Sequence, residues 1–271
     1  MKRNNLFQID FESLLLLAKE AATKGALIHR NGLAKSISAQ TKSSRLDLVC
    51  EVDIETEKVI VEHILNERPD DSIIGEEGYN RNGNSGVCWI IDPLDGTVNY
   101  LHRYPAFGIS IGVEIDKIGA IGVVYDTFQE RIYTGIIDNQ AKCDGETIFV
   151  SNCSSLENAL ITTGFLPNRE IRTLQGEILT DILPNVLDIR RSGSPIIDFC
   201  RVASGVIDGF YEFGLKKWDV SAGSVIAQAS GAKVTTLAVN DKTIESLIVA
   251  SAPEIHQQLL ELVINSWEKH K

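Results

Sequence analysis

Two aspartates follow one short apolar run in the stretch WIIDPLDGTVNY. Asp92 and Asp95 stand three residues apart, where Pro93 removes a backbone donor and Gly96 permits a tight turn. Like charges a few ångströms apart raise each other's pKa unless a cation lies between them. The pair therefore predicts a shared divalent metal ion. If the N–H groups of Gly96 and Thr97 open a helical turn, they also suit a phosphate.

Two further acidic motifs strengthen this prediction. Glu76 and Glu77 are adjacent in the motif GEEG, at the end of the preceding apolar run, and Asp219 in WDVSAG stands at a predicted helix N-terminus. One carboxylate at a strand end is ordinarily a solvated surface residue, but the set in this order favours a site. Oxygen ligands with few histidines nearby favour Mg²⁺ over Zn²⁺.

Composition and charge exclude several other classes. The chain has 271 residues, of which 44% are hydrophobic, and a formal net charge of −11, which disfavours a nonspecific nucleic-acid binder. No apolar run reaches the 18 or so residues that a membrane span needs. The five cysteines are odd in number and form no CxxC pair, which disfavours a disulfide framework or a zinc site. Without a recognisable signal peptide, we expect a reducing cytoplasm.

The pattern of apolar residues predicts a mixed α and β protein. Two short apolar runs that end in carboxylates, at Glu76 and Asp92, predict buried central strands. An antiparallel meander is expected over residues 107–114, 120–125 and 131–136. Helices are expected over residues 10–30, 54–67, 174–183, 195–207, 221–229 and 253–269, and a loop or short hairpin over 42–53. We expect one domain over residues 1–271, with possible halves of about 1–150 and 151–271.

A second motif matches the nucleophile elbow of serine hydrolases. Residues 108–112 read GISIG, a G-x-S-x-G match centred on Ser110. That motif requires a strand, a sharp turn and a helix, whereas these residues alternate like a continuous strand. No histidine lies in an evident partner motif, so we do not expect a serine hydrolase.

The motifs TKSSRLDLVCEVD, GEEG, WIIDPLDGTVNY and WDVSAG, in this order, resemble those of the inositol monophosphatase family of metal-dependent, lithium-sensitive phosphatases. They span residues 41–223. The resemblance implies a layered αβαβα sandwich of the inositol monophosphatase and fructose bisphosphatase type, and a homodimer, for which the apolar meander is the candidate shared surface. It also implies a Mg²⁺-dependent phosphomonoesterase acting on a small-molecule phosphate ester, inositol monophosphate first. Fructose bisphosphate, a nucleotide phosphate or another sugar phosphate are the alternatives, and a partner-binding regulatory protein on the same fold is the alternative of another class.

The resemblance also implies two to three Mg²⁺ ions with particular ligands. Glu76, Asp92 and the carbonyl of Leu94 would hold the first ion. Asp92, Asp95 and Asp219 would hold the second, so that Asp92 bridges the two. A third ion, bound more weakly, would be coordinated by Glu76. Two such ions about 3.5 to 4 Å apart stabilise the attacking and leaving oxygens of an in-line displacement.

The remaining family roles concern water and substrate. Asp53 and Thr97 would act with Glu76 in catalysis by orienting the attacking water, and Glu77 would support the metal ligands. Six residues would contact the substrate. They are Gly96, Thr97, Gly193, Ser194, Glu212 and Asp219. Glu212 would contact substrate hydroxyls, although a solvated turn residue is the other interpretation of its position.

Four residues depart from the usual family pattern. Pro195 stands where a small residue such as Ala is usual, Cys50 stands where Thr is common, and a Lys216-Lys217 pair precedes the WDVSAG motif. Pro195 is expected to affect the substrate loop, and therefore the choice of substrate more than the chemistry.

Overall fold

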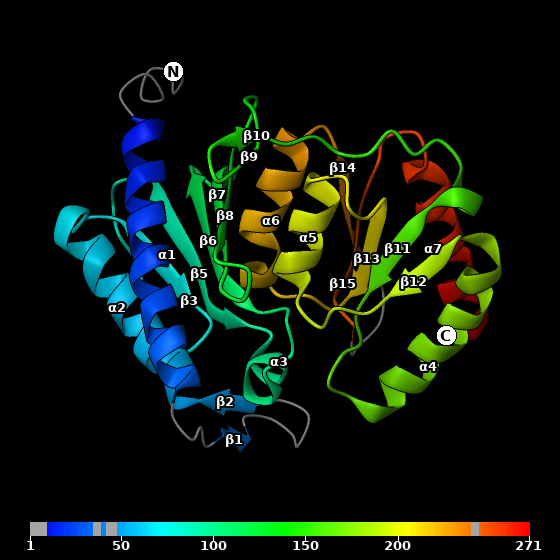
Figure 1. The fold of residues 1–271 in the computed structure, drawn as a ribbon, viewed down its shortest axis with the longest axis horizontal. Helices are drawn as coiled ribbons and strands as arrows, with labels where there is room; N and C mark the ends of the chain where they lie inside the picture. The colour runs from blue at the N-terminus through cyan, green and yellow to red at the C-terminus, as the bar shows by residue number, and fades with distance from the viewer. Residues whose placement is uncertain (1–9, 35–38, 42–47, 240–243) are drawn as a thin grey trace.

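The secondary-structure elements stack in five layers, α, β, α, β, α (Figure 1). The computed structural model describes residues 10–34, 39–41, 48–239 and 244–271. Helices α1 (Phe11–Leu33) and α2 (Glu51–Glu67) cover one face of a first sheet, and α5 (Pro195–Ala203) and α6 (Lys217–Ala229) lie between the two sheets. Helices α4 (Arg169–Ile182) and α7 (His256–His270) cover the far face of the second sheet. The predicted layered sandwich is confirmed.

The first sheet has eight strands in the order β10-β9-β8-β7-β6-β5-β3-β4. β3 runs parallel to β5, and the other neighbours are antiparallel. The strands are β3 (Ser72–Gly75), β4 (Asn80–Arg81), β5 (Val87–Asp95), β6 (Gly108–Ile115), β7 (Ile118–Asp126), β8 (Arg131–Ile136), β9 (Lys142–Cys143) and β10 (Glu146–Thr147). The predicted meander is β6 to β8, and both predicted central strands, β3 and β5, are present.

A second sheet, which the sequence analysis does not predict, contains five strands in the order β12-β11-β13-β15-β14. Its strands are β11 (Leu160–Thr163), β12 (Asp188–Arg190), β13 (Gly209–Phe213), β14 (Lys233–Ala238) and β15 (Ser246–Ser251). The first three are only three to five residues long and lie between helices, where so short an apolar run does not distinguish strand from helix. The sheet becomes recognisable only through pairing: β11 runs parallel to β12 and β13.

The N-terminal ends of α1 and α2 are set by aspartates. Asp10 caps α1 by accepting from the N–H groups of Glu12 and Ser13. α2 starts three residues before its predicted start, because Asp53 accepts hydrogen bonds from the N–H and the thiol of Cys50. Before α2, strands β1 (Ala39–Thr41) and β2 (Leu48–Cys50) pair antiparallel, so the chain forms a hairpin; residues 42–47 lie outside the described residues.

Three glycines let α6 approach the first sheet closely. Gly112, Gly122 and Gly135 are neighbours across β6, β7 and β8. A Cβ at any of them would collide with α6 atoms of Ser221, Ala222 or Ile226 respectively. The helix therefore lies directly on the strands, which brings its first turn to the end of β5.

Ser110 occupies the middle of β6 and is fully buried, and its hydroxyl donates to the carbonyl of Trp218 at 3.2 Å. The serine of the G-x-S-x-G match is therefore an anchor for α6, not an exposed nucleophile.

Several helix ends differ from the prediction. α6 begins at Lys217, four residues before its predicted start, and this places Asp219 at the third helical position. α5 ends at Ala203 and α7 begins at His256. The shorter elements are helix α3 (Thr97–His102) and two 3₁₀ turns, η2 (Leu156–Asn158) and η3 (Leu183–Asn185). In the part of the chain that the structure describes, we find no helix with the length and apolarity to cross a bilayer.

Candidate active site

The two aspartates of WIIDPLDGTVNY both lie on β5. The prediction that the strand ends at Asp92 is wrong, because β5 continues to Asp95 with an irregularity in its pairing to β6. Pro93 has no N–H to offer the ladder, and its carbonyl instead accepts from Nε2 of the buried His29 at 2.9 Å. The irregularity keeps both carboxylates inside the protein: Asp92 is 1% exposed and Asp95 8%.

Four carboxylates interact strongly at this point. Burial raises the pKa of Asp92 well above its usual value, and the charges of Glu76, Asp95 and Asp219 raise it further. Burial likewise raises the pKa of Asp95 to about 7 and that of Asp219 well above its usual value. The four residues come from β5, the turn after β3 and the first turn of α6, so the structure brings the predicted acidic motifs together.

The donor set fits a hard divalent cation in its chemistry, because it consists of buried carboxylate oxygens that destabilise one another without a cation. Among the described residues, however, no three such side chains stand in ready-made ligand geometry. Several oxygens instead accept from the protein itself: Asp92 Oδ1 from the Leu94 N–H at 3.0 Å, and Asp219 Oδ2 from the Lys216 N–H at 2.6 Å.

Helix α3 starts at Thr97, directly after the cluster. Gly96 has φ +82°, a left-handed conformation that favours glycine, and a Cβ there would collide with the Ala106 carbonyl. The Thr97 hydroxyl lies 3.1 Å from both Asp53 Oδ1 and the Leu94 carbonyl oxygen. Burial is the main cause of a raised pKa at Asp53. The predicted pair Asp53 and Thr97 is therefore in direct contact.

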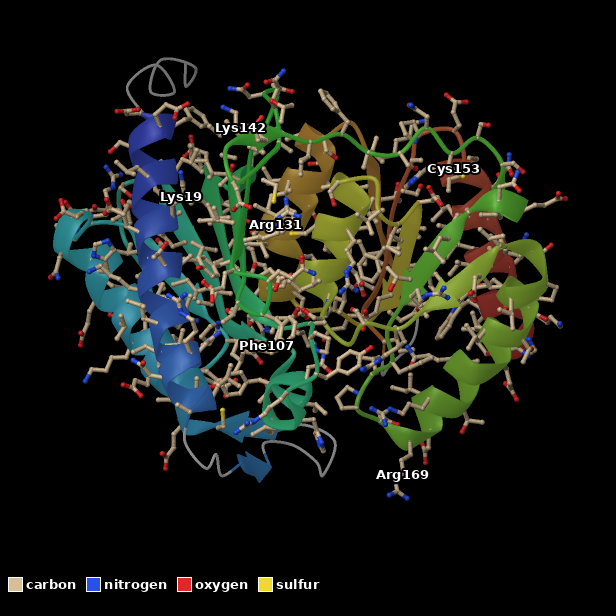
Figure 2. The ribbon with its side chains drawn as sticks, viewed as in Figure 1. Lys19, Phe107, Arg131, Lys142, Cys153 and Arg169 are labelled. Atoms are coloured by element: carbon tan, nitrogen blue, oxygen red, sulfur yellow. The ribbon has the colours of Figure 1, made fainter. Side chains whose placement is uncertain are left out.

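Aromatic packing holds α3 in place. The ring of Tyr100 meets Phe107 edge to face at 5.2 Å, and its hydroxyl donates to the carbonyl of His29 at 2.7 Å. Phe107 lies in the interior near α3, as its label in Figure 2 shows. His29 thus supports both α3 and the Pro93 segment. Nothing in the sequence pattern distinguished it from an ordinary buried helix residue.

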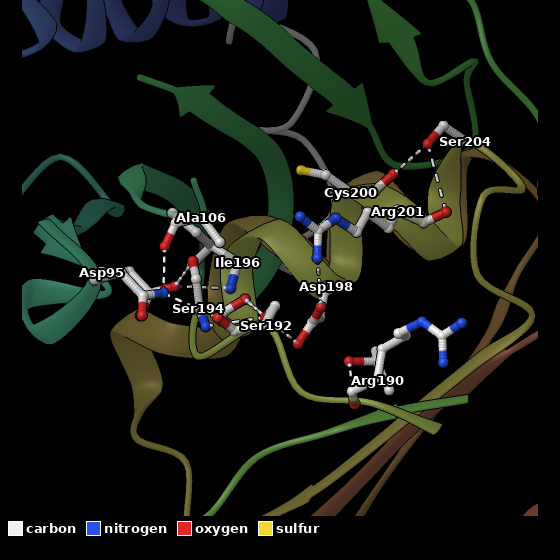
Figure 3. A network of polar contacts seen from close by, with 12 residues as sticks. Asp95, Ala106, Arg190, Ser192, Ser194, Ile196, Asp198, Cys200, Arg201 and Ser204 are labelled. Carbon is white, nitrogen blue, oxygen red and sulfur yellow. Dashed lines mark hydrogen bonds and ion pairs between the residues drawn. The ribbon is translucent and has the colours of Figure 1, made fainter. Parts of the chain in front are cut away.

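The loop before α5 binds Asp95 directly. Ser194 donates from its hydroxyl to Asp95 Oδ2 at 2.6 Å, and the Ile196 N–H donates to the same oxygen at 3.0 Å (Figure 3). The predicted substrate-loop residue Ser194 is therefore a partner of a proposed metal ligand. Pro195, between them, takes the first helical position of α5, where its missing N–H is not needed.

A second buried carboxylate holds this loop from behind. Ser192 Oγ donates to Asp198 Oδ2 at 2.6 Å and accepts from the Ser194 N–H at 3.1 Å (Figure 3). Asn99 on α3 donates to the carbonyls of Ala106 and Ser192. The loop is thus fixed from both α5 and α3, and the sequence analysis did not identify Ser192 or Asp198.

Glu212 lies in β13 at the opposite side of the site. It is 7% exposed, so the interpretation as a solvated turn residue is wrong. Burial raises its pKa well above the usual value. A Cβ at Gly164 would collide with its carboxyl group, so the close approach of β11 and β13 here requires a glycine.

The motif GEEG is held by a residue that the sequence analysis missed. Glu57 on α2 is 5% exposed and accepts from the N–H groups of Glu77 and Tyr79, at 2.9 and 3.0 Å. The backbone N–H of Glu77 thus donates to the Glu57 carboxylate that holds the turn. Glu76 lies between this turn and the cleft.

The site opens into a cleft of about 760 Å³. Its lining includes Pro195 and six of the predicted site residues: Glu76, Asp95, Gly96, Thr97, Gly193 and Glu212. An adjoining cleft of about 360 Å³ is lined by Asp219 and again by Glu76 and Glu212. Lys216 and Lys217 form ion pairs with Glu245 and Glu114. The charge of Lys216 also acts on Asp219, where it partly offsets the rise in pKa that burial causes.

A family model described as "Inositol monophosphatase family" matches residues 10–271. The chain belongs to this family. The inositol-1-monophosphatase of Mycobacterium bovis is 34% identical over 232 residues, which are 82% of this chain and 80% of that protein. The "Nus factor SuhB" of Pasteurella multocida is 33% identical and covers 92% of this chain and 95% of its own. The solved structure of "Thermotoga maritima IMPase" superposes with a TM-score of 0.86 at 26% identity, over 96% of this chain and 100% of that one.

These comparisons confirm the resemblance seen in the motifs and the mixed α/β architecture of an inositol monophosphatase. As a member of this family, the chain is a phosphoric monoester hydrolase.

Proposed function

We propose that this chain is a Mg²⁺-dependent phosphomonoesterase that hydrolyses inositol monophosphate. The observation that carries the proposal is the cluster of carboxylates around Asp92, whose mutual repulsion raises its pKa beside a cleft wide enough for a sugar phosphate. A site for a neutral ligand is not expected to contain four acids, because they repel one another. Fructose bisphosphate, a nucleotide phosphate and other sugar phosphates are the alternative substrates.

Glu76, Asp92 and the Leu94 carbonyl would hold one Mg²⁺ ion, and Asp92, Asp95 and Asp219 a second. A third ion would lean on Glu76. When bound, such ions lower the pKa of a bound water and neutralise charge on the phosphoryl oxygens. Lithium is expected to inhibit by competing for these positions.

Asp53 and Thr97 orient the attacking water. The Thr97 hydroxyl donates to Asp53 Oδ1, which leaves a lone pair of Thr97 Oγ1 to accept from the water. A proton that leaves the water can pass through Thr97 Oγ1 to Asp53. Burial raises the pKa of Asp53 and so favours its taking this proton.

The substrate is held from both sides of the cleft. The N–H groups of Gly96 and Thr97, at the start of α3, bind the phosphate, and Glu212 on β13 binds hydroxyls of the alcohol part. Gly193 has φ +84°, which keeps the loop before Ser194 close to the cleft. The phosphate and the alcohol part of the substrate are thus bound on opposite sides of the cleft.

The test is phosphate release from a panel of esters with and without Mg²⁺. We expect inositol 1-phosphate to be hydrolysed only with the metal. Asp92→Asn is expected to lower kcat by several powers of ten with an intact fold, because one lost carboxylate changes both ion sites. Near wild-type activity of Asp92→Asn would refute the two-ion assignment.

A partner-binding regulatory protein is the second candidate, favoured by the name "Nus factor SuhB" of the Pasteurella multocida relative. Affinity capture with wild type and Asp92→Asn separates the two functions. A partner that binds both forms equally supports a role independent of catalysis. No phosphate release from any ester, together with such a partner, would replace the enzyme proposal.

We also propose one domain over residues 1–271, a homodimer, a cytoplasmic location, and no binding of nucleic acid or membranes. The net charge of −11 supports the last point. The meander stays the candidate shared surface. Side chains such as Ile109 and Ile111 are fully buried in this chain's own core, so the contact would be made by its exposed apolar residues Ile118 and Phe128. Sedimentation at micromolar concentration tests the dimer.

A further inference from the structure

The turn that carries Glu76 joins β3 to β4, two strands that pair antiparallel. The N–H of Gly75 donates to the carbonyl of Tyr79 at 2.7 Å, and the N–H of Glu76 donates to that of Ile91 on β5 at 3.1 Å. These bonds fix the start of the turn within the sheet. The N–H groups of Glu77 and Tyr79 instead donate to an acceptor outside the sheet.

The acceptor is Glu57 on α2, which uses a different carboxylate oxygen for each N–H group. Oε2 accepts from the Glu77 N–H at 2.9 Å, and Oε1 accepts from the Tyr79 N–H at 3.0 Å. The carboxylate lies so close to the end of β3 that a Cβ at Gly75 would collide with it. Glu57 is 5% exposed, so water has little access to these bonds. Two acceptor oxygens on one side chain of this length are what the turn requires.

The same helix also holds Asp53. Asp53 and Glu57 are four residues apart on α2, so they lie on one face of the helix, about one turn apart. Asp53 Oδ1 lies 3.1 Å from the Thr97 hydroxyl. Burial raises the pKa of Asp53, and the charge of Glu76 adds to this rise, so the two carboxyl groups interact. α2 therefore contacts Thr97 with one side chain and the turn of Glu76 with the next.

We propose that Glu57 is a positioning residue for Glu76, which fixes the turn between β3 and β4 in the conformation that binds Mg²⁺. The inference rests on the proposed Mg²⁺-dependent function and adds a residue to it. Glu57 acts through the backbone of the turn and does not touch the ion. A turn that is ordered before the ion arrives loses less conformational freedom on binding, so the affinity for the ion is higher.

Glu57→Gln tests the inference, because Gln keeps the size of the side chain but has one oxygen and one NH₂ group. The NH₂ group would face an N–H group of the turn, so one of the two hydrogen bonds is lost. We expect the dissociation constant for Mg²⁺, measured by calorimetry, to rise about ten- to a hundredfold, the value of a hydrogen bond to a charged group. At saturating Mg²⁺ kcat should return to near the wild-type value, because excess ion selects the binding conformation of the turn. A merely structural role would lower kcat equally at every Mg²⁺ concentration.

Gly75→Ala is a second variant, which leaves Glu57 in the chain but adds the Cβ that collides with its carboxylate. It should weaken Mg²⁺ binding in the same direction. Glu55→Gln is the matched control, because Glu55 is exposed on the same helix. This substitution should change the dissociation constant for Mg²⁺ less than threefold.

The inference is refuted if Glu57→Gln, folded by circular dichroism, binds Mg²⁺ as tightly as wild type, or if its loss of kcat persists at saturating Mg²⁺. Hydrogen exchange in metal-free wild type is a test that does not depend on any variant. The amides of Glu77 and Tyr79 should be protected, and exchange as fast as in an unfolded chain would refute the ordered turn. Wild type that binds no Mg²⁺ and releases no phosphate from any ester would instead refute the phosphatase function itself.

Discussion

Without metal, the buried Asp95 makes the protein less stable as pH rises. Burial raises the pKa of Asp95 from 3.8 to about 7, so the folded chain keeps a proton that the unfolded chain releases between these values. For such a group the unfolding free energy falls as pH rises from the unfolded to the folded pKa. One pKa unit corresponds to about 1.4 kcal/mol, so the loss is on the order of 4 kcal/mol. The raised pKa values of Asp92 and Asp219 act in the same direction.

A second buried group, His29, opposes this pH dependence in the unfolding free energy measured for wild type alone. Burial lowers the pKa of His29 from 6.5 to about 4, so its contribution to stability rises with pH over that range. The informative quantity is therefore the difference between wild type and Asp95→Asn, since His29 is present in both. Asn keeps the size of the side chain and an oxygen that can accept from Ser194.

The assay is urea unfolding in a chelator from pH 4 to pH 8. We expect the stability of wild type, relative to Asp95→Asn, to fall by up to about 4 kcal/mol over this range, which is about 8 to 16 °C in Tm. Mg²⁺ should restore wild type more at pH 8 than at pH 5, because protons compete with the ion. Asp188→Asn is the control: Arg190 lowers the pKa of Asp188 below 3.8, so this carboxyl is ionised in the folded and the unfolded chain over most of the range and its difference curve should be nearly flat. Parallel curves for wild type and Asp95→Asn would refute the argument.

Three substitutions test the other contacts of the site. Ser194→Ala removes the 2.6 Å bond to Asp95, worth about 1.5 to 3 kcal/mol, and should weaken Mg²⁺ binding at least tenfold by calorimetry; unchanged binding would contradict it. Thr97→Ala breaks the contact with Asp53 and should lower kcat far more than it raises KM in steady-state assays. Glu212→Gln should cost about ten- to a hundredfold in kcat/KM for polyol phosphates and little for an aryl phosphate; equal losses would exclude a recognition role.

The sequence alone predicted much of the first half of the fold. Apolar runs of strand length that are bounded by turn residues are local signals. These signals identified β3, β5 and the meander β6 to β8. The sequence also predicted a tight turn at Gly96, and the structure has φ +82° there. The same local signals failed at the second sheet, because β11 and β13 are too short for their period to separate strand from helix.

The sequence by itself determined which acids come together in the cluster, since residue type and motif order were enough to select Glu76, Asp92, Asp95 and Asp219. Their support was decided by tertiary structure alone. Ser194 and Asp95 are 99 positions apart in the chain, and they meet only because glycines in three strands let α6 lie on the first sheet with α5 beside it. The physical reason is that a hydrogen bond between distant residues depends on how whole layers pack, and that packing leaves no local pattern at either partner.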